Sequence, residues 1–73
     1  MQPRPAVFDA GGFERLASEW DELAAMHLSA AVGYRNQGAG REAFGCARSA
    51  EFWSKCAAEA RIVAGGLRSY GCA

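Results

Sequence analysis

Four residues of this chain have the chemistry of a metal ligand or a reactive thiol: His27, Cys46, Cys56 and Cys72. A histidine such as His27 can bind a metal or sense pH. Cys46 lies about one helical turn from the position that would face His27 in the fold predicted below. A structural zinc site needs four ligands, and no other Cys, His or carboxylate joins this pair on its stripe. We therefore predict that His27 is a packed structural residue that binds no metal.

The three cysteines do not form a disulfide framework. Their number is odd, and no pair has the CxxC spacing of a zinc or redox motif. Cys46 and Cys56 would lie about 15 Å apart along one helix, which is too far for a disulfide bond. We predict reduced thiols in a reducing compartment. An intermolecular bridge or an oxidation response of Cys56 or Cys72 is kept as an alternative.

The sequence carries no enzymatic motif. Serines occur at five positions, but none has a positioned base or the sequence of a nucleophile elbow. The glycine-rich stretch GAGREAFG follows no predicted strand and matches neither a P-loop nor a dinucleotide-binding fingerprint. We expect no enzymatic activity, no cofactor and no small-molecule substrate.

Composition restricts the class of protein further. A chain of 73 residues forms one domain at most, and its core is small. Its eight basic and eight acidic residues cancel, which argues against nucleic acid or an anionic membrane as the partner. The N-terminal segment lacks the apolar core of a signal peptide, and no apolar run has the length of a membrane span. We expect a cytoplasmic protein.

The first half of the chain predicts one long helix. Residues 1–9 form an extended arm that contains two prolines, and Asp9 is a good N-cap with Phe8 and Phe13 at hydrophobic-staple spacing. A helix is predicted over residues 10–35 because apolar residues recur at steps of three and four. This seam consists of Phe13, Leu16, Trp20, Leu23, His27, Ala30 and Tyr34.

The second half predicts a matching helix after a short turn. Residues 36–40 form the turn, where Gly38 suits the left-handed position that ends a helix. The second helix is predicted over residues 41–64; Gly65 and Gly66 are expected to stop it in a Schellman cap that uses Leu67, which leaves residues 65–73 as a tail. Its seam consists of Ala43, Cys46, Ala50, Trp53, Ala57, Ala60 and Ala64.

The predicted fold is all-α, an antiparallel two-helix hairpin of coiled-coil type. The short turn makes the helices antiparallel neighbours, so large residues of the first seam meet alanines of the second. The acidic first helix then lies beside Lys55, Arg61 and Arg68. Two helices cannot cover both flanks, so self-association or a partner protein should complete the fold. The residues expected to bind that partner are Met26, Leu28, Phe44, Phe52, Cys56, Ile62 and Val63.

A heptad-patterned hairpin of this size, with a glycine-rich turn and the closing segment VAGGLR (residues 63–68), resembles the small co-chaperones of type III secretion needle proteins. The similarity covers roughly residues 31–68. It implies a hairpin that packs on a tetratricopeptide-type chaperone and helps to hold a needle subunit soluble. It supplies no catalytic residue.

Three functions follow as hypotheses. The first is a non-enzymatic co-chaperone or adaptor subunit that packs its apolar flanks on a partner protein or on a second copy. The second is a small inhibitor or regulator of phage or plasmid type that docks on a larger target. The third is a thiol or metal sensor that uses Cys56, Cys72 or His27.

Overall fold

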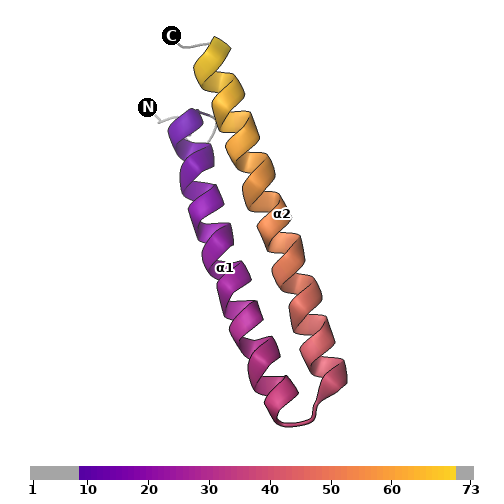
Figure 1. Ribbon diagram of the computed structural model, residues 1–73. Coiled ribbons are helices and arrows are strands. Elements are labelled where there is room, and N and C mark those ends of the chain that lie inside the picture. The colour runs from indigo at the N-terminus through magenta and orange to yellow at the C-terminus, as the bar shows by residue number, and fades with distance from the viewer. Residues whose placement is uncertain (1–8, 71–73) are drawn as a thin grey trace, which may run out of the picture.

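The computed structural model describes residues 9–70, which form two α-helices joined by a short turn (Figure 1). Helix α1 spans Ala10–Asn36 and helix α2 spans Gly40–Tyr70. The helices run antiparallel, and α2 extends beyond the start of α1 at the end opposite the turn (Figure 1). No strand occurs within residues 9–70. The predicted all-α helical hairpin is therefore confirmed.

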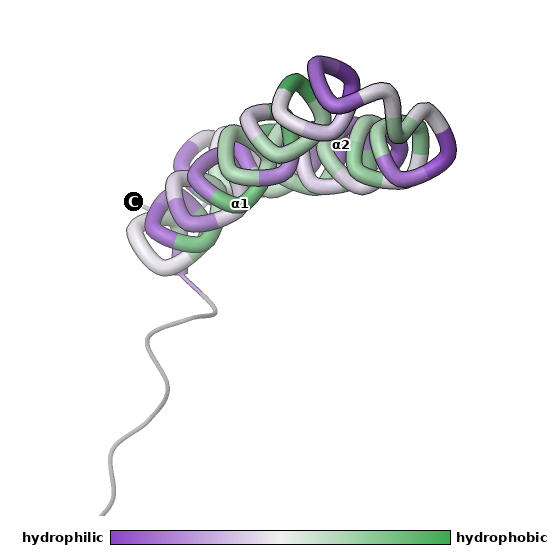
Figure 2. The backbone as a smooth tube through the Cα atoms, turned by 90° about the horizontal axis from the view of Figure 1, so that it is seen from below, coloured by the Kyte–Doolittle hydropathy of each residue, from purple (hydrophilic) through white to green (hydrophobic). Residues whose placement is uncertain are grey.

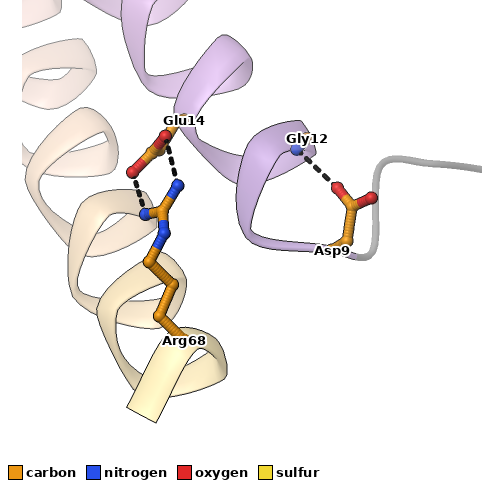
Figure 3. A network of polar contacts seen from close by, with 4 residues as sticks. All are labelled: Asp9, Gly12, Glu14 and Arg68. Atoms are coloured by element: carbon orange, nitrogen blue, oxygen red, sulfur yellow. Dashed lines mark hydrogen bonds and ion pairs between the residues drawn. The ribbon is translucent and has the colours of Figure 1, made fainter. Parts of the chain in front are cut away.

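Helix α1 begins at the predicted cap. The backbone of Asp9 is extended, and its Oδ1 accepts a hydrogen bond of 2.7 Å from the backbone N–H of Gly12 (Figure 3). The backbone N–H of Phe13 donates to the carbonyl of Asp9 at 3.0 Å, which closes the first helical turn. These two bonds satisfy donors that a helix start leaves without partners. The predicted staple partner, Phe8, lies outside the described residues.

Helix α1 ends in a Schellman motif. Gly38 has a φ of 82°, the left-handed conformation that the sequence predicted for it. The N–H of Gly38 donates to the carbonyl of Arg35 at 3.0 Å, and the N–H of Ala39 donates to the carbonyl of Tyr34 at 2.9 Å. The chain reverses within three residues, and α2 begins at Gly40, one residue earlier than predicted.

The predicted end of the second helix is wrong. Helix α2 does not stop at Gly65 and Gly66 but continues for another turn to Tyr70. Two helical glycines cost about 1 kcal/mol each relative to alanine. Continuing the helix places Arg68 against Glu14 of α1, where its guanidinium donates to the carboxylate. That contact between the helices favours the longer helix.

Only small residues are buried between the helices. The buried apolar residues are all alanines: Ala17, Ala24, Ala31, Ala50, Ala57, Ala60 and Ala64. Ala17 and Ala57 are completely covered, and no large side chain among residues 9–70 is. Phe13 and Trp20 pack, partly buried, against the cluster of Ala17, Ala57 and Ala60. Large residues of α1 thus meet alanines of α2, as the sequence predicted.

The buried stripe of α1 is rotated by about one residue from the predicted seam. Ala17, Ala24 and Ala31 are buried, although none of them belongs to the predicted seam. Ala30 is exposed, and Tyr34 is 38% exposed, although the sequence placed both in the seam. The alanines allow the two backbones to approach closely, so they occupy the line of contact while larger neighbours lie beside it. The stripe predicted for α2 is confirmed at Ala50, Ala57, Ala60 and Ala64.

Two ion pairs and an aromatic pair join the helices toward the end opposite the turn, which we call the open end. Arg61 Nη2 lies 2.6 Å from Asp21 Oδ2, and Arg68 pairs with Glu14 through two hydrogen bonds (Figure 3). The rings of Trp20 and Trp53 lie 6.2 Å apart, tilted by 38°. The predicted alignment of the acidic first helix with Arg61 and Arg68 is therefore confirmed.

The hairpin is one helix layer thick. Its Cα atoms extend over 52 Å in the longest direction and 12 Å in the shortest. Hydrophobic and hydrophilic residues alternate along both helices (Figure 2). Most domains bury their core between at least two layers of secondary structure, whereas no second layer covers either broad face of this hairpin within residues 9–70. Within residues 9–70, neither helix is long and apolar enough to cross a membrane.

Candidate interaction surface

Six of the seven residues predicted to bind a partner are exposed. They are Met26, Leu28, Phe44, Phe52, Ile62 and Val63, and their exposed fractions run from 44% to 73%. The seventh, Cys56, is half-buried. An isolated exposed apolar residue is common on protein surfaces, so the arrangement of these side chains matters more than their exposure.

On one face, Leu28 lies at the centre of a groove that both helices form. Two adjoining hollows share Leu28 and Ala47, and together we call them the Leu28 groove. The hollow nearer the middle of the hairpin is also lined by Asp21, Ala24, Ala25, Ala50, Glu51 and Ser54. The hollow nearer the turn is also lined by Ala31, Val32, Arg35, Gly40, Ala43 and Phe44.

The two parts of the Leu28 groove differ in the size of their side chains. The part near the turn carries Val32 and Phe44, which are 54% and 64% exposed. Arg48 lies with its guanidinium 5.8 Å from the centre of the Phe44 ring, in a cation–π contact one turn along α2. The middle part is lined instead by small residues, chiefly alanines and Ser54. The hollow near the turn therefore has large side chains at its edge, and the middle hollow is lined mainly by small ones.

The charges at the two ends of the groove have opposite signs. Arg35 lies at the end near the turn, and Asp21 with Glu51 lies at the middle end. Asp21 also receives the hydrogen bond from Arg61, so its carboxylate is held in place at this end. Leu28 is seven residues from both Arg35 and Asp21, which puts all three on the same side of α1.

The opposite flank carries a second apolar group, which we call the Phe52 face and which consists of Met26, Phe52, Cys56 and Val63. Met26 is separated from Leu28 by about 200° around the axis of α1, so the two point to opposite sides. The Phe52 ring meets the Trp53 ring edge-on, with centroids 5.1 Å apart and planes at 75°. Trp53 in turn contacts Trp20, so an exposed aromatic residue is joined to the interior of the hairpin.

The remaining candidates do not gather into a chemical site. His27 is half-buried, and Cys46 and Cys56 are free, half-buried thiols. Within residues 9–70, no three His, Cys, Asp or Glu side chains lie close enough to hold a metal ion. Cys72 lies outside the described residues. Ile62 is exposed but lines neither the Leu28 groove nor the Phe52 face.

The ion pair between Glu14 and Arg68 shifts the pKa values of both of its side chains at the open end. Hydrogen bonds from Arg68 lower the pKa of the Glu14 carboxyl below its usual value, and the same contact raises the pKa of Arg68. Both side chains remain about half exposed to solvent. The pair therefore fixes the alignment of the helix ends and stabilises the fold only modestly.

Leu28 and Phe44 were predicted from the sequence, whereas the groove residues Val32, Asp21 and Arg35 were not. Val32 lies outside the predicted seam, and it lines the groove near the turn together with Phe44. The spacing of seven residues on either side of Leu28 could have indicated Asp21 and Arg35. That spacing points to Asp21 and Arg35 only when the position of Leu28 at the centre of the groove is already known.

Comparison of the chain with models of protein families, with characterised proteins and with solved structures finds no match.

Proposed function

We propose that this protein is a non-enzymatic protein–protein interaction module that works by packing its apolar faces on another protein chain. The observation that supports this most strongly is that small residues are buried between the helices while large apolar residues are exposed, the reverse of an ordinary core. Alanines fill the contact between the helices, while Met26, Leu28, Val32, Phe44, Phe52 and Ile62 remain more than half exposed. Burying a side chain of this size contributes about 1.5–3 kcal/mol. The hairpin leaves most of that contribution for a partner to provide.

The proposed role is that of a co-chaperone or adaptor subunit. A thin hairpin with two apolar faces can lie in the groove of a larger helical protein, or can join two chains by using one face for each. Aromatic side chains such as Phe52 often anchor such contacts. The net charge of zero agrees with a protein partner rather than with nucleic acid.

The test places a carboxylate at the Phe52 face and measures partner capture. Phe52→Asp should weaken capture of the native partner by about tenfold or more, because a buried unpaired charge costs several kcal/mol. The helicity of the variant at high concentration should stay close to that of the wild type. Ser69→Asp is the matched control, because it adds the same charge at an exposed position near the end of α2, outside both the Leu28 groove and the Phe52 face.

The Leu28 groove is tested in the same assay with Leu28→Asp. Loss of capture in at least one of the two apolar variants, with Ser69→Asp unaffected, supports the proposal. Full capture by both variants contradicts it, and so does a wild-type protein that is strictly monomeric and captures no chain at all.

A further inference from the structure

We propose that the Leu28 groove is covered by the Leu28 groove of a second copy of this chain, in an antiparallel four-helix dimer. This inference rests on the proposed function, because it names the occupant of one of its two apolar faces. The two hairpins would face each other through their grooves. The two-fold axis would lie between them, perpendicular to the helices, at the level of Leu28. Helix α1 then lies over α1 of the other copy and α2 lies over α2, each pair antiparallel.

The charged residues at the two ends of the groove place the two-fold axis at the level of Leu28. Arg35 and Asp21 lie about 10 Å from Leu28 along α1, in opposite directions, at 1.5 Å per residue. Both line the groove, one at each end. A two-fold rotation at Leu28 places Arg35 of each copy beside Asp21 of the other. One pair of residues thus supplies two ion pairs across the interface, as an isologous contact requires.

The shapes of the two groove parts agree with the same axis. Rotation about the level of Leu28 brings Val32 of one copy over Ala24 and Ala25 of the other. It brings Phe44 toward Ala50 and Ser54, which line the open middle part of the groove. Protruding side chains therefore enter a part lined by small residues, which is the arrangement by which helices interdigitate.

A parallel dimer lacks this match. With both turns at the same end, the part that carries Val32 and Phe44 would lie on the same part of the other copy. Protruding side chains would then meet each other, and the open parts lined by alanines would remain unfilled. The antiparallel arrangement uses one surface twice and fills both of its parts.

The contact area is sufficient for a specific interface. The overlap of two antiparallel hairpins runs from the turn of one copy to the level of Ser18, about 30 Å at 1.5 Å per residue. Two helices side by side, each about 10 Å across with their side chains, give this overlap a footprint of about 600 Å², at the lower end of what each partner buries in a specific interface. The zero net charge offers no general repulsion between copies. The Phe52 face points outward in this dimer, where it can bind the partner.

A charge-exchange experiment tests the arrangement. Arg35→Glu and Asp21→Lys each place like charges at both contacts of their own dimer, so each variant alone should dimerise about tenfold more weakly than the wild type, or weaker still. In an equimolar mixture, the glutamate introduced into one chain meets the lysine introduced into the other, and the unchanged Asp21 meets the unchanged Arg35. Sedimentation equilibrium should therefore show the mixture recovering dimers that neither variant forms alone.

Matched controls separate this outcome from general effects of charge. Arg41→Glu and Glu22→Lys make the same changes at exposed positions on the backs of the helices, and they should leave dimerisation unchanged. Asp21→Lys also removes the contact with Arg61. Mixing cannot restore a loss of that intramolecular kind, so recovery in the mixture is specific to the proposed contact.

Three results would overturn the inference. They are a wild type that stays monomeric at high concentration, variants whose mixture does not recover, and a dimer that Phe52→Asp disrupts while Arg35→Glu does not. None of these removes the proposed function, which is judged by partner capture. Conversely, the mixed variants could recover dimers while the protein captures no other chain. That outcome would support this dimer and restrict the interaction to self-association.

Discussion

The two halves of the hairpin differ in how far each completes its own packing. At the open end, Phe13 and Trp20 lie against buried alanines, and two ion pairs join the helices. Toward the turn, the large side chains Leu28, Val32 and Phe44 line an open groove. A two-helix hairpin can thus hold itself together along one stretch and present apolar surface along another.

The difference shows that small residues have two roles in this chain. Ala17 and Ala57 are covered completely, because the opposite helix lies against them. Ala25 and Ala47 are exposed and line the Leu28 groove. Alanine allows close approach wherever another helix is present, and it leaves a hollow wherever one is absent.

The largest expected effect comes from removing the aromatic residue at the open end. Trp20→Ala should lower the free energy of unfolding by about 2–3 kcal/mol, because a half-buried Trp loses its packing on the alanine cluster and on Trp53. Phe44→Ala, in the open groove, should cost the monomer much less. Urea unfolding of both variants at a concentration that favours monomers measures the difference. Equal losses would show that the two halves are packed alike.

Glycine substitutions should act with opposite signs at the turn and near the end of α2. Gly38→Ala should destabilise the hairpin by about 1 kcal/mol, because its φ of 82° is unfavourable for alanine. Gly65→Ala should stabilise it by about 0.5–1 kcal/mol, because the residue is helical and an added Cβ meets no atom within 4 Å. Thermal unfolding of the two variants checks both signs. A destabilising Gly65→Ala would indicate that α2 ends before this residue.

The smallest expected effect is a pH dependence at the open end. The folded-state pKa of Glu14 lies below its ordinary value of 4.5. The contribution of Glu14 to the free energy of unfolding is therefore present in full above pH 4.5. It is lost as the pH falls through the lowered pKa of the folded state. The difference in stability between wild type and Glu14→Gln should shrink on acidification and in high salt. Glu22→Gln, on the far side of α1, is the control; a difference between wild type and Glu14→Gln that does not change with pH would contradict the prediction.

Much of the fold was predictable because local signals agreed. Asp9 and Gly38 have the residue types that helix starts and turns require, and both take the expected roles. The end of α2 was not predictable, because it depends on a contact between Arg68 and Glu14, which are 54 residues apart. The buried stripe of α1 was missed by one position, because neighbouring residues such as Leu16 and Ala17 fit a helical repeat almost equally well.

The exposed residues of the interaction surface were largely predictable from their positions on the helical wheel, but the groove was not. Sequence periodicity separates Leu28 from Met26, which lie on opposite flanks. It cannot show that Val32 and Phe44, on different helices, line one hollow. That relation depends on the rotation of α1 against α2, which the close contact at Ala24 and Ala31 sets.

We propose that the alanine contact alone holds this hairpin only weakly and that another chain completes it. Equilibrium unfolding over a hundredfold range of protein concentration, with the mass followed by sedimentation, tests this most directly. We expect a marginally stable monomer of 7.8 kDa at low concentration and a midpoint that rises as dimers form. A strictly monomeric protein that unfolds cooperatively, with a stability of about 5 kcal/mol or more at every concentration, would contradict the account.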